Sequence, residues 1–224
     1  MTIGLLAAVA WFGAAVASEP PRVGPPPGAF LPSAVLPSPL GGNVGVGAGI
    51  SSVYGGLRTD VEIEAEASPV RRVALGVRAA VPTLLPATTT WTFRAQGLAI
   101  DRDMFHLAAT GLLLVQPDTP SPIPSGVQGG LGIAAEGGPD DLRADASLLV
   151  WHTFADGDEE IRILDLAEFG LTGCIRRRIH VRTGVDRARL RLDVSVASPH
   201  AWARLGGVLE PGDPRGEIWS GVSW

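Results

Sequence analysis

The sequence lacks several features that would define its class at once. None of the 224 residues is lysine, so all 18 basic residues are arginine, and Cys174 is the only cysteine. A single cysteine excludes an internal disulfide. No apolar run reaches the ~18–20 residues of a membrane-spanning helix, although 46% of the residues are hydrophobic. The net charge of -5 gives no indication of nucleic-acid binding.

Signatures of catalysis and of cofactor binding are missing as well. The sequence contains no HExxH motif, no G-x-S-x-G elbow and no Walker loop. Its four histidines show no metal-ligand spacing; they are His106, His152, His180 and His200. We therefore predict no catalytic residue, no cofactor and no metal site, and the chain is not expected to be an enzyme.

What the sequence does contain is a strict alternation of apolar and charged residues over 58–81. Apolar side chains occupy one parity; they are Val61, Ile63, Ala65 and Ala67, and after Pro69 they are Val73, Leu75, Val77, Ala79 and Val81. Charged side chains dominate the other parity; they are Asp60, Glu62, Glu64, Glu66, Arg72 and Arg78. A period of two is typical of β-strands with one apolar and one polar face.

Two segments precede this pattern. Residues 1–17 resemble a secretory signal peptide, with a short apolar core and the small residues Ala15 and Ala17 at the expected cleavage site, although no basic residue precedes the core. Residues 18–42 are rich in proline, which is typical of an extended leader. We expect cleavage near Ala17 and a single β-domain over residues 43–224.

The alternation extends over about a dozen candidate strands, each near the ~9–11 residues that a tilted strand needs to cross a bilayer. Their expected ranges are 43–54, 58–68, 70–81, 90–101, 104–116, 127–136, 142–154, 160–171, 174–185, 187–197, 200–209 and 215–224. The connections between them alternate between longer loops and tight turns. Longer loops are therefore expected at one end of the strands and tight turns at the other.

Aromatic residues fall near both ends of these strands. Tyr54, Trp91, Trp151 and Phe154 lie at the end with longer loops, and Phe105, Phe169, Trp202 and Trp224 lie at the end with tight turns. Such rings prefer the headgroup level of a membrane. The last residues, Val222-Ser223-Trp224, follow Ile218 on the same parity, although Ser220 interrupts the apolar pattern.

In these features residues 43–224 resemble outer-membrane β-barrel proteins, either a small porin or a structural barrel. The resemblance implies an all-β fold, a closed antiparallel up-and-down transmembrane barrel of about 12 strands, in the outer membrane of a Gram-negative envelope. It also implies contact with outer-membrane lipid and recognition of the C-terminal strand, ending at Trp224, by the barrel-assembly machinery.

A membrane barrel would direct the polar parity inward, so the sequence predicts a set of interior charges. They are Asp60, Glu62, Glu64, Glu66, Arg72, Arg78, Arg94, Arg143, Asp145, Arg176, Arg178, Arg182, Arg189 and Arg191. Acidic residues cluster in 60–66 and basic residues, with His180, in 176–191. This segregation allows two interpretations: ion pairs that fill or constrict a structural barrel, or a transverse field across a narrow pore.

Two rival classes remain open at this point. A soluble periplasmic or secreted lipocalin-like protein would show the same alternation with the opposite sidedness. A lipid-modifying barrel enzyme would share the architecture, and His152-Thr153 beside Trp151 is the nearest approach to the His–Ser pair of such enzymes. Three places fit poorly. Asp165 requires a bulge in strand 160–171, Arg177 lies on the apolar parity of strand 174–185, and strand 104–116 is apolar on both faces.

Overall fold

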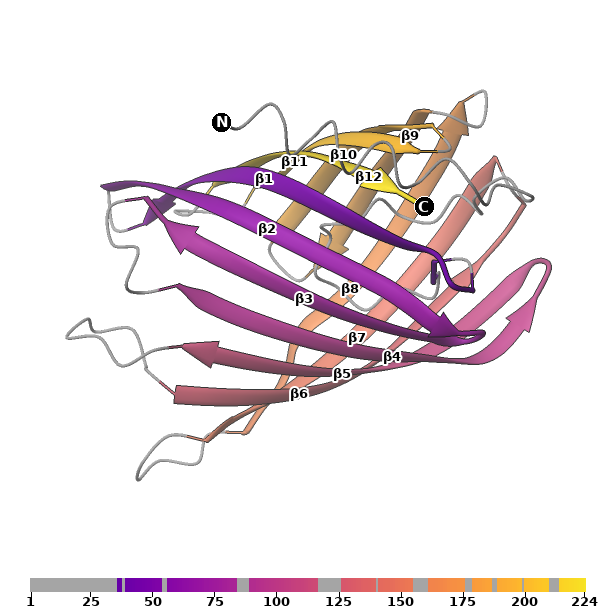
Figure 1. Ribbon diagram of the computed structural model, residues 1–224, viewed down its shortest axis with the longest axis horizontal. Coiled ribbons are helices and arrows are strands. Elements are labelled where there is room, and N and C mark those ends of the chain that lie inside the picture. The colour runs from indigo at the N-terminus through magenta and orange to yellow at the C-terminus, as the bar shows by residue number, and fades with distance from the viewer. Residues whose placement is uncertain are drawn as a thin grey trace.

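The computed structural model of the chain is an antiparallel sheet of twelve strands that closes on itself (Figure 1). It describes residues 36–37, 39–53, 56–83, 89–116, 126–139, 141–154, 161–175, 179–186, 189–198, 200–209 and 214–224. The strands are β1 (Gly42–Val53), β2 (Gly56–Val70), β3 (Val73–Pro82), β4 (Thr90–Arg102), β5 (Phe105–Gln116), β6 (Gly126–Gly137), β7 (Leu142–Phe154), β8 (Ile161–Ile175), β9 (Ile179–Asp186), β10 (Arg189–Ala197), β11 (Ala201–Leu209) and β12 (Arg215–Ser223). Consecutive strands pair throughout, and β1 pairs with β12, so the predicted up-and-down barrel is confirmed.

The outer face of the barrel is apolar. Large apolar side chains of the strands are 37–75% exposed there, and they come from every strand whose outward side chains are described. Among them are Val46, Val61, Phe93, Leu113, Leu131, Phe169, Val181, Leu190, Leu205 and Ile218. The charged parity points inward and is largely buried. This sidedness is the reverse of that of a soluble barrel such as a lipocalin.

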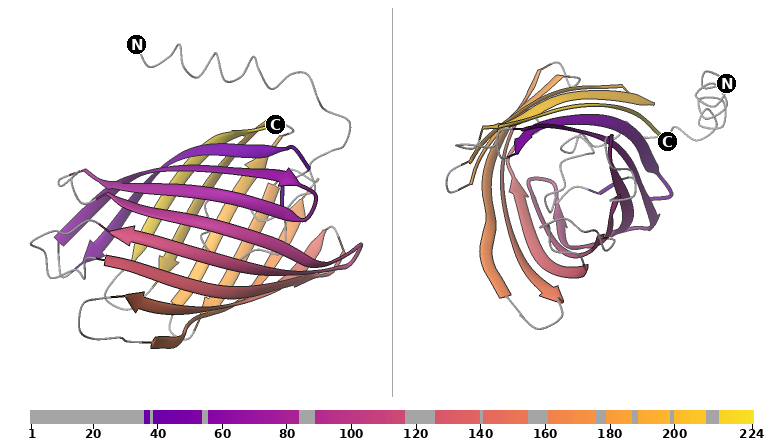
Figure 2. Two further views of the ribbon diagram at one scale, coloured as in Figure 1. Left: turned by 60° about the horizontal axis from the view of Figure 1, so that its bottom comes forward. Right: turned by 90° about the vertical axis from the view of Figure 1, so that its left-hand side faces the viewer.

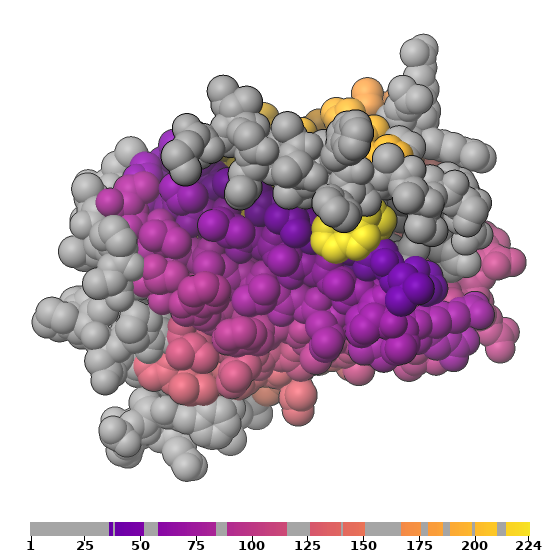
Figure 3. Space-filling model, viewed as in Figure 1, coloured from indigo at the N-terminus to yellow at the C-terminus, as the bar shows by residue number. Residues whose placement is uncertain are grey.

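Both ends of the chain that forms the sheet meet at the end of the barrel with tight turns. Gly42 and Trp224 exchange two backbone hydrogen bonds of 3.1 Å, which places the last residue beside the start of β1 (Figure 3). Turns at 71–72 and 103–104 lie at this end, whereas the strand ends Pro82, Thr90, Gln116 and Gly126 lie at the other. The four longer connections predicted after β3, β5, β7 and β11 all fall at the same end, but β1–β2 and β9–β10 at that end are separated by two residues only. Figure 2 shows the inclined strands from two sides.

The turn between β2 and β3 lies three residues later than predicted. The turn was expected at Ser68–Pro69, but β2 continues to Val70 through a register shift between Ala67 and Val70. Ser68 Oγ donates hydrogen bonds to the carbonyls of Val70 (3.1 Å) and Val73 (2.8 Å), which holds the irregular segment. A bulge accommodates proline because it leaves one position of the ladder unpaired.

The hairpin between β8 and β9 also differs. A turn was expected at Thr172–Gly173, but β8 continues to Ile175, which pairs with Ile179. Both isoleucines lie on the exposed apolar face, so the longer hairpin places two more apolar side chains outward. The predicted irregularity near Asp165 is confirmed, because the register between β7 and β8 shifts from Leu149–Leu166 to Trp151–Arg162.

The predicted aromatic positions are mostly confirmed where the structure describes them. Trp91, Phe105, Phe169 and Trp224 are exposed on the outer face. The prediction for Trp202 is wrong, because its side chain is 6% exposed and points into the barrel. Tyr54 lies outside the described residues, as do the side chains of Trp151 and Phe154.

Candidate functional site

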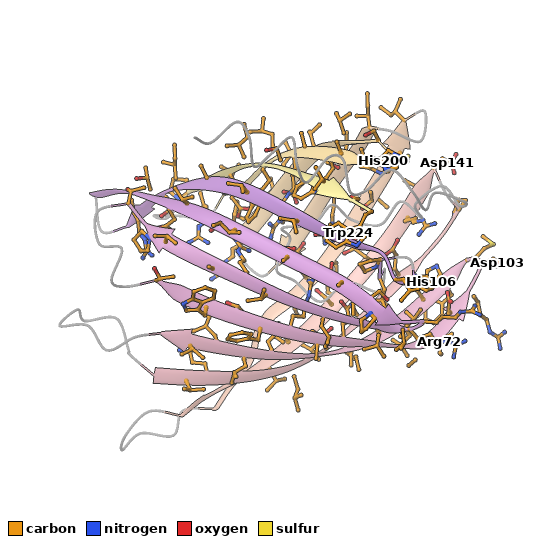
Figure 4. All side chains as sticks on the ribbon, viewed as in Figure 1. Arg72, Asp103, His106, Asp141, His200 and Trp224 are labelled. Carbon is orange, nitrogen blue, oxygen red and sulfur yellow. The ribbon has the colours of Figure 1, made fainter. Side chains whose placement is uncertain are left out.

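The interior of the barrel is the candidate site, and most of the predicted charged residues lie there. Those that the structure places inward, buried or partly buried, are Asp60, Glu62, Glu64, Glu66, Arg78, Arg94, Arg143, Asp145, Arg182, Arg189 and Arg191. Arg176 and Arg178 lie outside the described residues, between the ends of β8 and β9. The prediction that Arg72 points into the barrel is wrong. Arg72 occupies the β2–β3 turn with φ 73° and is exposed at the end of the barrel (Figure 4).

We call the inward ionisable residues of β2, β3 and β7–β12, together with Arg94 of β4, the charged wall. On its first part the acidic residues of β2 find partners on β3 and β4. Arg78 pairs with Glu62, and Arg94 pairs with Glu66. Asn43 Nδ2 also donates to Glu66 Oε2 at 3.2 Å. Glu62 and Glu66 therefore have basic partners within two strands.

Arg182 is the centre of a second group on β7–β9. Its Nε and Nη2 donate to the two carboxylate oxygens of Asp145 at 3.2 and 2.5 Å, and Nη1 donates to Glu168. Such bidentate geometry is the strongest form of a guanidinium–carboxylate pair. Nearby, Arg143 Nη1 donates to Glu136 Oε1 at 3.0 Å. Every arginine of this group is thus neutralised locally.

A third group joins β10, β11 and β12. Arg204 Nε and Nη2 donate to Asp193 Oδ1 at 3.0 and 2.7 Å, and its Nη2 lies 3.5 Å from Glu217 Oε2. Arg191 Nε donates to the other oxygen of Asp193 at 2.8 Å. The Arg204 side chain is 0% exposed, so this group is fully enclosed by the barrel.

The pairing brings acidic residues next to the arginines of β9–β11, so both signs of charge occur along this part of the wall. The ion pairs of Arg78, Arg94, Arg143, Arg182, Arg191 and Arg204 with residues of other strands join strands that are adjacent or one apart. Adjacent strands lie about 4.8 Å apart, within reach of one arginine, whereas the opposite wall is farther away. The partners are four interior acids outside the predicted set of charges; they are Glu136, Glu168, Asp193 and Glu217.

Two inward tryptophans lie against the seam where β1 meets β12. The Trp219 ring lies against Gly47, and a Cβ at Gly45 would stand 2.6 Å from the Trp202 ring. Trp219 Nε1 donates to Glu217 Oε2 at 3.2 Å, and the Arg78 guanidinium lies 5.0 Å from the Trp219 ring centroid. The inward glycines of β1, Gly45 and Gly47, therefore leave the space that the two aromatic rings occupy.

Between Arg94 and the charges near the turns, His106 and Glu136, the inward surface of β4–β6 is uncharged. We call the central inward residues of β4–β6 the neutral wall; they are Gln96, Leu98, Ala108, Thr110, Leu112 and Ala134. Leu98 packs against Ala108 and Ala134. Gln96 and Thr110 face each other in register, and their side-chain polar atoms have no hydrogen-bond partner among the described residues. The wall explains why strand 104–116 is apolar on both faces.

Other kinds of site are absent from the described part of the chain. No group of three or more His, Cys, Asp or Glu side chains there could hold a metal ion. No helix in the same residues is long and apolar enough to cross a membrane. Cys174 Sγ lies 3.9 Å from His180 Nε2, and the pair has no further ligand-type neighbour among the described residues.

Comparison with known proteins gives the same fold. No protein-family model and no curated protein matches the sequence. Among solved structures, the KdgM porin in complex with disordered oligogalacturonate matches with a TM-score of 0.56 and 7% identity, over 81% of this chain and 99% of that chain. The KdgM porin alone matches with a TM-score of 0.54 and 8% identity, over the same shares. The β domain of the Bordetella autotransporter BrkA matches with a TM-score of 0.42 and 14% identity, over 83% of this chain and 99% of that one.

These findings define the class by fold. The chain is a closed twelve-stranded antiparallel barrel of the transmembrane type, and this is the fold of the KdgM porin. Sequence identities this low carry the fold alone, so the solute of that porin is not transferred to this chain by the comparison.

Proposed function

We propose that this chain is an outer-membrane barrel of a Gram-negative envelope whose interior forms a narrow pore for small polar solutes. The observation that carries the membrane part is the sidedness of the sheet. Apolar residues encircle the outside and ion pairs line the inside, an arrangement that is stable in lipid and unfavourable in water. The expected signal peptide and leader support export, and recognition of Trp224 by the assembly machinery belongs to the same proposal.

The lateral pairing of charges favours a pore over a filled structural barrel. Ion pairs that run along one wall leave the centre of the barrel unbridged, whereas pairs between opposite walls would close it. The low exposure of the paired side chains, 0–21%, favours a narrow passage. Twelve strands enclose more space than the eight of barrels whose interior is just filled by side chains.

The balance of interior charge favours solutes without a large net charge. Arginines that would attract a polyanion are already paired, as Arg94 is with Glu66 and Arg182 is with Asp145 and Glu168. The KdgM structure contains oligogalacturonate, which is a polyanion. For this chain we propose weak selection between small anions and cations, in contrast to a pore with unpaired arginines.

Planar-bilayer recording of the purified full chain tests this function. We expect small single-channel conductance and weak ion selectivity. The Glu62→Gln/Glu66→Gln variant releases Arg78 and Arg94 and should shift the selectivity toward anions. Insertion without any channel would reject the pore and leave the structural barrel, and recovery as a soluble protein without a heat-dependent shift on SDS gels would reject the membrane barrel.

A further inference from the structure

Three arginines gather on the rim of the barrel at the end with tight turns. Arg71 and Arg72 form the β2–β3 turn, and Arg102 ends β4 next to the β4–β5 turn. All three are exposed, and the Arg71 side chain is 73% exposed. The mechanism proposed for the interior uses none of them. We call Arg71, Arg72 and Arg102 the arginine rim patch.

The β2–β3 turn is held against β4, on the strand that leads to the β4–β5 turn. Leu98 N donates to the Arg72 carbonyl at 2.8 Å, and Arg71 Nη2 lies 3.9 Å from Asp101 Oδ2. The left-handed conformation of Arg72, φ 73°, and the two hydrogen bonds of Ser68 Oγ fix the course of the first turn. Figure 4 shows Arg72 and Asp103 at the same end of the barrel. The charges are therefore concentrated on a defined backbone.

The patch adjoins the edge of the apolar outer face. Arg102 is in register with Phe105, which is 42% exposed, and Val70 and Met104 are exposed beside the two turns. At this level of a membrane barrel the hydrocarbon gives way to headgroups. A guanidinium there can extend its apolar stem over neighbouring apolar residues while its charged head reaches a phosphate.

We infer that the arginine rim patch binds the phosphate of an anionic phospholipid headgroup, of which phosphatidylglycerol is the probe. The inference rests on the proposed function, because the patch meets lipid only if the barrel spans a membrane. Arg72 and Arg102 form no ion pair within the described ranges, and Asp101 is engaged by His106 at 3.1 Å. Asp103 is the exposed acidic residue beside the patch and opposes the binding.

Native mass spectrometry of the full chain in detergent, titrated with phosphatidylglycerol or phosphatidylcholine, tests the site. We expect the wild type to bind phosphatidylglycerol more tightly. An arginine near an anionic membrane surface contributes roughly a fivefold change in affinity, so Arg71→Gln/Arg72→Gln/Arg102→Gln should lose at least about tenfold. Asp103→Asn should gain up to about fivefold by the same rule.

Arg215→Gln is the matched control, because Arg215 is exposed at the opposite end of the barrel. Its affinity for phosphatidylglycerol should stay within about twofold of the wild type, since headgroup attraction falls off over a Debye length. If the triple variant does not fold, Asp103→Asn still decides: unchanged affinity rejects the site.

Equal affinities of wild type and triple variant would overturn the inference, as would complete displacement of the lipid by inorganic phosphate, which indicates a free-anion site. The heat-dependent gel shift, measured on the same samples, separates the two proposals. A folded barrel that inserts into vesicles but does not distinguish the two lipids rejects the rim site alone. A chain that fails to insert rejects both.

Discussion

The charged wall and the neutral wall line the same barrel but are stabilised in different ways. On the charged wall each guanidinium needs a carboxylate within reach, as Arg204 has in Asp193. On the neutral wall Leu98, Ala108 and Ala134 exclude water by packing, and the polar atoms of Thr110 and Gln96 have no hydrogen-bond partner among the described residues. The alternation of strands decides which side chains point inward; the residue types decide how each wall tolerates a change.

Mutations on the two walls should therefore change the stability of the barrel by different amounts. Removing one charge of an enclosed ion pair leaves its partner unneutralised, and this destabilises the protein by more than the intact pair stabilised it. Removing a polar atom that has no partner costs little and can stabilise the protein. The predictions below test this contrast, from the largest expected effect to the smallest.

The largest effect is expected for Arg204→Met. The substitution keeps most of the volume but leaves Asp193 and Glu217 with Arg191 alone, so the free energy of unfolding should fall by about 3–5 kcal/mol. Denaturant titration of the barrel in detergent, followed by the heat-dependent gel shift, measures it. A smaller loss of unfolding free energy than for the other substitutions would show that the ion pairs of Arg204 are not essential for stability.

A smaller effect is expected at the glycines that contact the tryptophan rings beside the β1–β12 seam. A methyl group at Gly47 would meet the Trp219 ring, so Gly47→Ala should destabilise the barrel by about 1–3 kcal/mol through overpacking. Gly216→Ala on β12 is the control, because nothing lies within 4 Å of a Cβ there. Equal unfolding midpoints for both variants would contradict the close packing of the Trp219 ring against Gly47.

On the neutral wall we expect Thr110→Val to be neutral or stabilising by up to about 1–3 kcal/mol, because it removes a buried hydroxyl that has no partner among the described residues. Thr183→Val, on the exposed outer face, controls for the change of side chain. The same denaturant titration compares them. Clear destabilisation at position 110 would mean that the hydroxyl is bound in the lumen by water or solute.

The smallest effect is expected for Arg58→Gln. Arg58 pairs with Asp60 at 2.9 Å like the arginines deeper in the barrel, but its side chain is 39% exposed at the end with long loops. Exposed pairs contribute roughly 0–1 kcal/mol. A change in the unfolding midpoint as large as that of Arg204→Met would show that depth in the barrel does not control the strength of these pairs.

The sequence predicts most of this structure because the face on which a strand residue lies can be inferred from the residues next to it. The alternation of the neighbouring residues is enough to predict that Glu62 points inward and Val61 outward. The same alternation predicts all twelve strands. Arg72 was misplaced because a bulge at Ser68–Pro69 moved the turn, and a bulge depends on hydrogen bonds that the pattern does not contain. Trp202 and Arg204 were missed as interior groups because each is a single large residue with no charged neighbour in the sequence. The partner of Arg204 lies on the adjacent strand β10, and the glycine that Trp202 contacts on β1 becomes a neighbour only when the barrel closes.

The central claim, that the apolar face meets lipid and the charged face does not, is tested most directly by spin labelling in bilayers. Single cysteines at Val61, Leu131 and Leu190, and at Glu62, Arg78 and Arg191, would carry a nitroxide in a Cys174→Ala background. The account predicts that the first set collides with oxygen dissolved in the hydrocarbon and is shielded from a water-soluble nickel complex, whereas the second set is shielded from the lipid phase. Equal collision rates for both sets, or the reverse pattern, would contradict it.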